Sequence, residues 1–225
     1  MKQQPQKSFV AEIIGPAGSG KSTLTQVLRH NQTVRAGLSV WRLPLRFLLR
    51  SAFLTLPTLL RLYAYPRLRW DDLKLVIQHH ALLQLLRRER TAGHAALLLD
   101  EGNLFAIAKL RAFGRNGATT DGCEPWLQKL LAATAPELDA VIWLDAPDSI
   151  LARRIREREK NHRMKHKSDA EIENHLSLYR SSFERVVEEL RKRNRDGIKI
   201  MRFSTDQLPV EQIADSIMAQ AGRRA

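Results

Sequence analysis

The residues best suited to chemistry lie near the amino terminus, in the stretch "GPAGSGKST". Gly15, Gly20, Lys21 and Ser22 have the spacing Gly-x-x-x-x-Gly-Lys-Ser. At this spacing the glycines allow a backbone arc whose N–H groups converge on phosphate oxygens. The lysine then reaches the outer phosphates, and the serine hydroxyl joins the shell of a magnesium ion. The stretch therefore predicts a loop that binds the phosphates of ATP or GTP.

The flanks of this loop agree, because such a loop joins a buried strand to a helix. "SFVAEIIG" is a short β-rich apolar run, and residues 21–30 have helical spacing. The positive end of that helix would point at the phosphates. The expected nucleotide-binding residues are Gly15, Pro16, Ala17, Gly18, Ser19, Gly20, Lys21, Ser22 and Thr23.

Apolar and amphipathic segments alternate along the rest of the chain. Strands are expected at residues 8–15, 37–43, 94–100, 138–145 and 197–204, and helices at 70–90, 104–115, 124–133, 146–159, 168–194 and 209–221. Two short helices separated at Pro57 are expected between 45 and 65, within a helical insertion at about 44–69. The alternation predicts an α/β fold with a parallel sheet covered on both faces, and we read residues 1–225 as one domain.

The composition limits the partners and the compartment. The net charge of +13, from 37 basic and 24 acidic residues, calls for phosphorylated or anionic partners. Because the basic residues are spread out and no aromatic-interleaved motif accompanies them, nucleic acid is disfavoured. Cys123 is the one cysteine, and no secretory signal is recognisable, so we expect a cytoplasmic protein. Charges and prolines exclude a transmembrane helix at residues 43–65.

Two aspartates end predicted strands. Asp100 ends "ALLLD" and Asp145 ends "VIWLD". The carboxyl ends of parallel strands border the ligand crevice in open α/β sheets, so both are candidates for the site. A buried structural aspartate is the alternative for Asp100, and a cap of the helix near Pro147 is the alternative for Asp145.

The motifs "GPAGSGKSTL", "LLLDEG" and "VIWLDAPDSILARRIRERE", with a segment rich in lysine and histidine after them, resemble the P-loop nucleoside and nucleotide kinases, closest to thymidylate-kinase-like members. The resemblance implies a three-layer P-loop fold with a five-stranded parallel sheet and an arginine-rich lid at about 153–167. It also implies ATP and Mg²⁺ as cofactors and transfer of the γ-phosphoryl group to a small molecule.

The resemblance also assigns roles to residues. Lys21, Asp100, Arg154 and Arg158 are the expected catalytic residues, and Ser22 and Asp100 the expected metal partners. In the family, the acid at Asp100 orders magnesium through water or takes the proton of the acceptor. Arg154 and Arg158 match an Arg-x-x-x-Arg element and are expected to share a helix face over the transferring phosphate, where they would neutralise charge. A solvated helix is the alternative for these arginines.

The sequence departs from this family at Glu101. Thymidylate kinases and their relatives place an arginine directly after the strand-end acid, where it grips the acceptor. Glu101 has the opposite charge and would repel an acceptor that already carries a phosphate. We therefore expect the acceptor to offer a hydroxyl.

Several alternatives stay open. The apolar residues from Leu45 to Leu59, with Arg46 and Arg50 beside them, suit a helix packed on the core, an acceptor pocket or a peripheral contact with an anionic membrane. "LLLDE" also fits a P-loop ATPase with a regulatory or nucleic-acid-associated role, in which Glu101 would activate water. A nucleotide-binding protein without turnover is a third reading. The acceptor and the oligomeric state, including a homodimer, are not determined.

Overall fold

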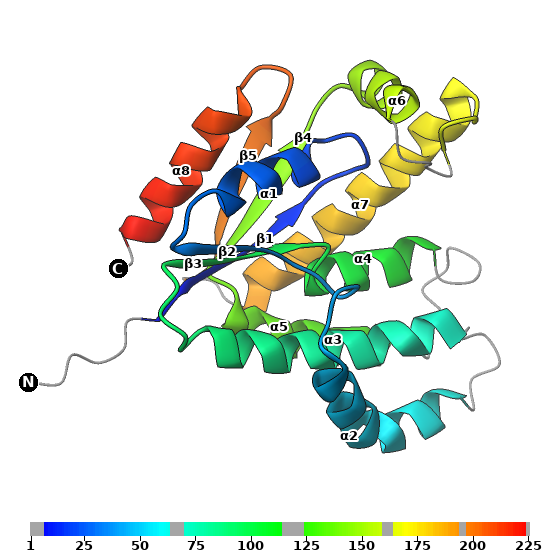
Figure 1. Ribbon diagram of the computed structural model, residues 1–225. Helices are drawn as coiled ribbons and strands as arrows, with labels where there is room; N and C mark the ends of the chain where they lie inside the picture. Colours follow the sequence, from blue (N-terminus) through cyan, green and yellow to red (C-terminus); the bar gives the residue numbers. More distant parts are fainter. Residues whose placement is uncertain (1–6, 64–69, 114–123, 159–163, 194–196, 224–225) are drawn as a thin grey trace, which may run out of the picture.

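The computed structural model describes residues 7–63, 70–113, 124–158, 164–193 and 197–223 (Figure 1). Five parallel strands form one sheet in the order β2-β3-β1-β4-β5. The strands are β1 (Phe9–Ile14), β2 (Val34–Leu38), β3 (Ala96–Asp100), β4 (Ala140–Asp145) and β5 (Lys199–Ser204). The predicted α/β fold with a five-stranded parallel sheet is thus confirmed.

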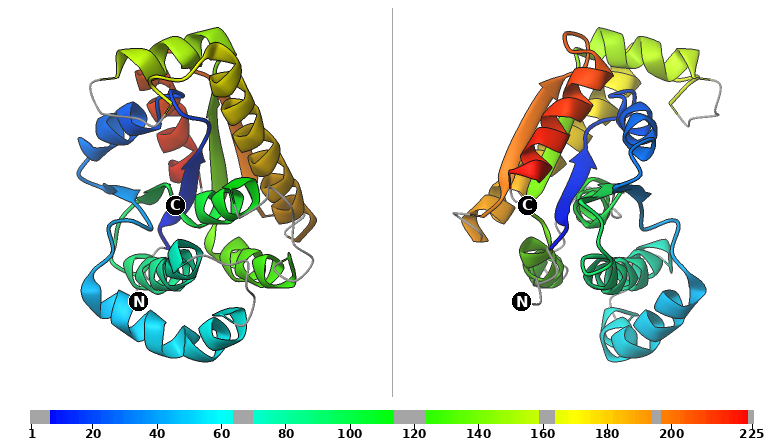
Figure 2. Two further views of the ribbon diagram at one scale, coloured as in Figure 1. Left: turned by 90° about the vertical axis from the view of Figure 1, so that its right-hand side faces the viewer. Right: turned by 60° about the vertical axis from the view of Figure 1, so that its left-hand side comes forward.

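The helices form a layer on each face of this sheet (Figure 1). They are α1 (Lys21–Arg29), α2 (Leu45–Tyr63), α3 (Trp70–Glu89), α4 (Asn103–Phe113), α5 (Glu124–Thr134), α6 (Asp148–Glu157), α7 (Asp169–Arg193) and α8 (Val210–Gly222). Helices α1 and α8 cover one face, and α3, α4, α5 and α7 cover the other. Helix α2 packs on α3 and lies outermost, as both views of Figure 2 show.

The central strands are buried on both faces, which explains why their sequences are apolar apart from Glu12 and the aspartates that end β3 and β4. All six residues of β1 are buried, as are the first four residues of β3 and the first five of β4. Side chains of a strand alternate between the two faces, so each helical layer receives half of them.

Strand β2 lies earlier in the chain than predicted. The expected strand covered residues 37–43, whereas the structure has β2 at Val34–Leu38. Its position follows from pairing: Val34 lies beside Ala96 and Leu38 beside Leu99, so β2 ends where β3 ends. Beyond it, the Val40 N–H donates to the carbonyl of Glu101 at 3.1 Å.

The expected break at Pro57 is wrong. Helix α2 continues through this proline from Leu45 to Tyr63 and curves along its length (Figure 2). A proline inside a helix removes one hydrogen bond and costs about 3 kcal/mol, usually with a kink. Packing on α3 opposes this cost, since Ser51 and Thr55 are buried and the Gln84 side chain donates to the Ser51 hydroxyl at 2.9 Å.

Helix α7 lies within the helix expected at residues 168–194 and begins with a capping box formed by Ser168 and Glu171. The Ser168 N–H donates to the Glu171 carboxylate at 3.0 Å, and the Glu171 N–H donates to the Ser168 hydroxyl at 3.3 Å. These reciprocal bonds satisfy two N–H groups that the first turn of a helix leaves without partners.

Charged side chains close the amino-terminal edge of the sheet. The Val10 N–H donates to the Asp139 carboxylate at 2.8 Å, and Arg90 pairs with the same carboxylate at 3.2 Å. Arg87 pairs with Glu137 at 2.6 Å. These contacts join the end of α3 to the starts of β1 and β4.

A buried carboxyl group joins β1 to α4. The Glu12 side chain has no exposed surface, and its two oxygens accept the N–H groups of Leu104 at 2.9 Å and Phe105 at 2.8 Å. Gly102 makes room for this group, because a Cβ there would lie 2.7 Å from the Glu12 carboxyl carbon. Glu12 therefore satisfies the first turn of α4 and fixes the chain that leaves β3.

Burial raises the pKa of Glu12 from 4.5 to about 7, although the backbone N–H donors act in the opposite direction. In the unfolded chain this carboxyl loses its proton near pH 4.5. The stability that protonated Glu12 provides is therefore complete below about pH 4.5 and is lost as the pH rises through about 7. The expected loss is roughly 3 kcal/mol.

We predict that Glu12→Gln, which cannot titrate, lacks this decline. Urea unfolding of both proteins across this pH range measures the free energies of unfolding. Glu184→Gln, an exposed position on α7, is the control and should follow the wild type. Parallel pH profiles for wild type and Glu12→Gln would contradict the assignment.

Candidate functional site

The glycine loop, residues 15–22, runs from the end of β1 into the first turn of α1, and its glycines have the backbone freedom that the sequence predicted. Gly15, Gly18 and Gly20 have φ values of 147°, 84° and 87°, which residues other than glycine rarely adopt. A Cβ on Gly15 would lie 2.1 Å from the Leu144 carbonyl oxygen, so the loop is pressed against the end of β4. Gly20 is the residue before α1, and no side chain caps the first N–H groups of this helix.

Lys21 folds back over this loop. Its ammonium donates to the carbonyl oxygens of Gly15 at 2.7 Å and Pro16 at 2.9 Å. The side chain is half-buried and lines the cavity described below. Burial lowers the pKa of Lys21 from 10.5 to about 8, and the negative charges of Asp100 and Glu101 act in the opposite direction.

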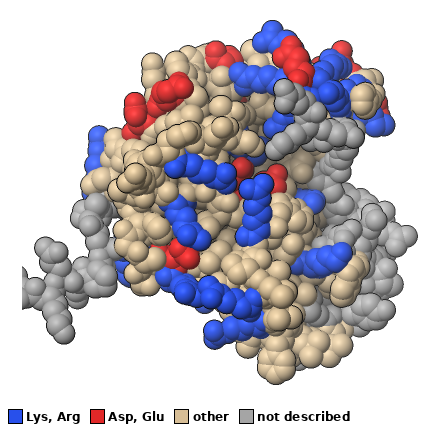
Figure 3. All heavy atoms as spheres, viewed as in Figure 1, with Lys and Arg blue, Asp and Glu red and all other residues tan. Residues whose placement is uncertain are grey.

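The loop lines one wall of a hollow that we call the central cavity, with a volume of about 340 Å³. Asp100 and Glu101, at the carboxyl end of β3, lie on the same cavity as Lys21 and Ser22. Figure 3 shows acidic atoms in a hollow with basic side chains around it. The cavity residues are Gly15, Ala17, Gly18, Gly20, Lys21, Ser22, Asp100, Glu101, Phe105, Lys109, Arg158, His175 and Tyr179.

Glu101 occupies an unusual backbone conformation. Its φ of 57° makes it the one residue other than glycine with a positive φ in the described part of the chain. Its carbonyl accepts the Val40 N–H, and the Ser39 hydroxyl lies 3.4 Å from it. Such a conformation costs about 1 kcal/mol or more and persists where neighbouring contacts hold it. It turns the chain between Asp100 and the buried Gly102.

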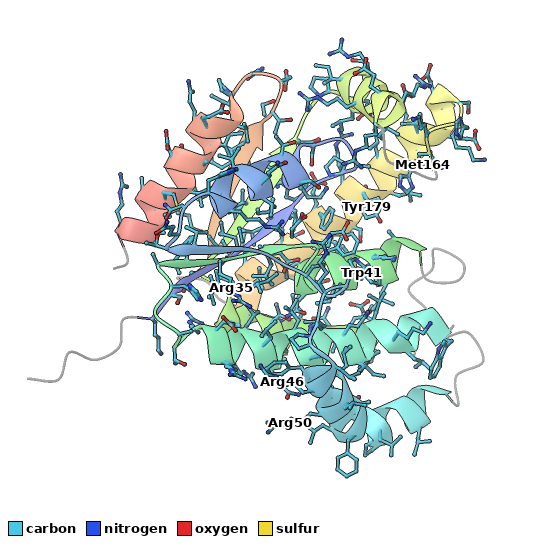
Figure 4. The ribbon with its side chains drawn as sticks, viewed as in Figure 1. Arg35, Trp41, Arg46, Arg50, Met164 and Tyr179 are labelled. Carbon is cyan, nitrogen blue, oxygen red and sulfur yellow. The ribbon has the colours of Figure 1, made fainter. Side chains whose placement is uncertain are left out.

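The wall opposite the loop is formed by α4 and α7. Phe105 and Tyr179 stack with ring centroids 6.4 Å apart, and His175 meets Tyr179 edge-on at 5.1 Å. The Lys109 ammonium lies 4.5 Å from the centre of the Trp41 ring. Figure 4 shows Tyr179 on α7 and Trp41 beside α4. This wall can present aromatic surface and positive charge to a molecule held beside the loop.

Arg154 does not lie over the loop's cavity. Its guanidinium donates to the Thr205 hydroxyl at 2.9 Å and to the Thr205 carbonyl at 3.0 Å, with the Gly18 carbonyl 3.4 Å away. It lines a second hollow, the α8 cavity, of about 380 Å³. The other residues of the α8 cavity are Gly18, Gly20, Thr23, Leu24, Leu144, Arg158, Thr205, Leu208, Val210 and Ile213.

Arg158 lies between the two hollows. Helix α6 ends at Glu157, and Arg158 follows it with extended backbone, so the two arginines do not share a helix face. Arg158 lines both the central cavity and the α8 cavity. Of the expected lid at about 153–167, residues 159–163 lie outside the described residues.

Asp145 has a structural partner. Arg180 of α7 donates to its carboxylate at 2.9 and 3.0 Å and to the Ala146 carbonyl at 3.0 Å. Pro147 is the residue before α6, and no side chain caps this helix. The carboxylate of Asp145 therefore holds α7 against the end of β4 rather than capping α6.

The remaining loop residues divide between the two hollows. Ser22 faces the central cavity and Thr23 the α8 cavity. The Ser19 hydroxyl is buried within the loop, and Pro16 contributes its carbonyl to Lys21. Among the residues that the structure describes, no group of three or more His, Cys, Asp or Glu side chains could hold a metal ion.

The sequence analysis did not identify the cavity wall formed by α4 and α7, nor the role of Glu12 in holding α4. Phe105 lies on α4, which is buried on nearly all sides, and His175 and Tyr179 lie on the amphipathic α7, so their sequence positions indicate only packing. Glu12 carried a usable signal, because a lone carboxylate within an otherwise apolar central strand requires a buried partner.

Comparison with known proteins finds solved structures of similar fold. Deoxyadenosine kinase from M. mycoides superposes with a TM-score of 0.54 and 14% identity, over 96% of this chain and 100% of that chain. Thymidylate kinase from Candida albicans gives 0.58 and 13%, over 97% and 93%. Shikimate kinase from Bacteroides thetaiotaomicron gives 0.51 and 13%, over 94% and 97%.

These likenesses confirm the predicted P-loop kinase fold. No curated protein sequence matches the chain. The sequence family described as the AAA domain matches residues 10–186, which run from β1 into α7 and make up well over half of the chain. The chain therefore belongs to this P-loop AAA-domain family.

Proposed function

We propose that the protein is an ATP-dependent kinase that transfers the γ-phosphoryl group to a hydroxyl of a small molecule. One observation carries this proposal: the glycine loop and Asp100 line one cavity, whose lining also includes side chains of α4 and α7. A phosphate tail on the loop would leave room for a second molecule against the wall of α4 and α7. A protein that only binds nucleotide has no need of such a wall.

In this proposal, the phosphates of the nucleotide lie in the central cavity and its base lies in the α8 cavity. The loop amides and Lys21 would hold the phosphates, since convergent N–H groups and a helix amino end favour anions. The α8 cavity offers apolar side chains and the fixed guanidinium of Arg154, which suits a planar base. The two cavities share Gly18, Gly20 and Arg158, so a nucleotide could extend from one into the other.

Ser22 and Asp100 fit a role in holding Mg²⁺, because they supply oxygen atoms to the same cavity. A phosphate-bound Mg²⁺ ion typically takes few protein ligands and keeps several waters, which agrees with the absence of a larger acidic cluster among the described residues. When bound, the ion would neutralise negative charge on the β- and γ-phosphates.

The protein's own residues would then position the two substrates and neutralise the negative charge of the transferring group. Lys21 and Arg158 would stabilise the charge that spreads over the transferring group. Asp100 would accept the proton of the acceptor hydroxyl or orient the shell of the ion. The α4 and α7 wall would hold the acceptor and keep water away from the transferring group.

We predict acceptor-dependent ADP formation. Wild-type protein with MgATP is screened against pooled alcohols, sugars, nucleosides and nucleotides, with Lys21→Ala as the blank. Loss of a charge-stabilising donor should lower the rate about a hundredfold or more. Lys192→Ala, which removes an exposed ammonium of α7 that pairs with Glu188 at 3.0 Å, is the control and should keep the wild-type rate. ADP formation that needs no acceptor would favour a P-loop ATPase instead.

A second prediction follows from the lowered pKa of Lys21. Above about pH 8 the free protein carries neutral Lys21, whereas bound phosphate favours the ammonium form. Binding of MgATP should therefore take up a proton above about pH 8, and the affinity should fall up to tenfold for each further pH unit. Below about pH 8 Lys21 is already protonated, so its titration should not change the affinity for MgATP.

Calorimetry in buffers with different ionisation enthalpies counts the protons taken up. Lys21→Arg keeps its charge at these pH values and should bind without this proton uptake. Binding of MgATP by the wild type without proton uptake at about pH 9 would contradict the assignment.

A third prediction concerns Glu101. Its carboxylate lies on the central cavity and would repel an acceptor phosphate. Glu101→Gln removes the charge and keeps the size, so kcat/KM for nucleoside monophosphates should rise about tenfold or more relative to hydroxyl acceptors. Glu184→Gln is the distant control. Efficient phosphorylation of thymidylate by the wild type would refute the preference for a hydroxyl.

A further inference from the structure

Helix α2 turns an apolar stripe away from the protein. Its residues recur at intervals of four or three positions, and they are between 48% and 79% exposed: Leu45, Leu49, Phe53, Leu56 and Leu60. Phe53 is the most exposed of these. The opposite side of the helix packs on α3 through Phe47, Ser51 and Thr55. The core therefore accounts for one face of α2 and leaves this stripe exposed among the residues that the structure describes.

Arginines flank the stripe. Arg46 and Arg50 lie one turn apart on α2, and Figure 4 shows them on the same side of the helix. With Arg87 and Arg88 of α3 they line a groove of about 480 Å³, which we call the arginine groove. Arg87 also pairs with Glu137 at 2.6 Å. Figure 3 shows this basic band along the lower part of the molecule, with uncharged surface below it.

The charge pattern of α2 excludes a crossing of the bilayer and favours contact with its surface. The sequence of α2 contains arginines and no acidic residue. No helix in the described ranges has the length and hydropathy needed to span a membrane. An exposed apolar stripe with cationic residues beside it is typical of helices that lie in the plane of an anionic membrane surface.

We propose that α2 docks the protein on the surface of an anionic phospholipid membrane. The leucines and Phe53 of the stripe enter the boundary between headgroups and acyl chains. The arginine groove then faces lipid phosphates, which match its four guanidinium groups in charge and in hydrogen-bonding geometry.

Other occupants fit these observations less well. In a two-fold dimer each patch meets its own copy, so the arginine grooves would approach one another and repel. Nucleic acid would satisfy the arginines but leave the leucines and Phe53 in water. A membrane with anionic lipids satisfies both the apolar stripe and the charges.

Co-sedimentation with vesicles tests the proposal without any measure of activity, so its outcome is independent of the kinase proposal. The full-length protein is mixed at low salt with vesicles of phosphatidylcholine alone or of phosphatidylcholine with phosphatidylserine. We expect binding to the anionic vesicles, weak or no binding to the neutral ones, and release as the salt concentration rises.

Two pairs of variants separate the two parts of the surface. Arg46→Gln with Arg50→Gln should weaken binding to the anionic vesicles about twenty-five-fold, because each arginine near such a surface contributes about fivefold in affinity. Leu49→Ser with Phe53→Ser should weaken it at least tenfold at the same salt concentration. Circular dichroism and thermal unfolding check that each variant folds.

Exposed positions far from α2 provide the matched controls. Arg191→Gln with Arg223→Gln, and Leu178→Ser, should bind as the wild type does. If Arg191→Gln with Arg223→Gln loses as much affinity for anionic vesicles as Arg46→Gln with Arg50→Gln, the net charge of the protein alone attracts it to the membrane. That result would overturn the proposal. Absence of binding to anionic vesicles, or a dimer in light scattering that Phe53→Ser converts to monomers, would overturn it as well.

Discussion

The functional edge of this protein depends on a carboxyl group that water never reaches. Glu12 lies in the central strand β1 and accepts the first N–H groups of α4, which would otherwise be buried without partners. This contact fixes where α4 begins, and so fixes the turn at Asp100 and Glu101 opposite the glycine loop. A buried charge is costly, and the shift of its pKa toward neutrality reflects that cost.

The glycine loop and the turn at Asp100 and Glu101, which we call the acidic turn, obtain their shapes in different ways. The loop obtains its shape from residues that lack side chains, because the backbone must press against the Leu144 carbonyl. The acidic turn obtains its shape from contacts that force Glu101 into a left-handed conformation. Lys21 connects the two electrostatically, since its ammonium rests on loop carbonyls while Asp100 and Glu101 raise its proton affinity. Contacts within the protein therefore hold the loop and the acidic turn in shape.

Local features of the sequence predicted much of this architecture. The loop spacing, the apolar strands and the capping box at Ser168 each act within a few residues, so they can be read without the fold. The break at Pro57 was predicted wrongly because packing on α3 outweighs the lost hydrogen bond. The partner of Glu12 could not be predicted, since it lies 92 positions away. The anchoring of Arg154 by Thr205 likewise depends on how α6 meets the end of β5.

The two edges of the sheet differ in what their polar groups contact. At the amino edge, Asp139 takes the Val10 N–H and the Arg90 guanidinium, so its charge is satisfied within the protein. At the carboxyl edge, charged groups line open hollows. Sequence change therefore has different consequences at the two ends of the same strands. Substitutions around the hollows change the shape and charge of open surface, whereas loss of Asp139 would leave the Val10 N–H and the Arg90 guanidinium without this partner.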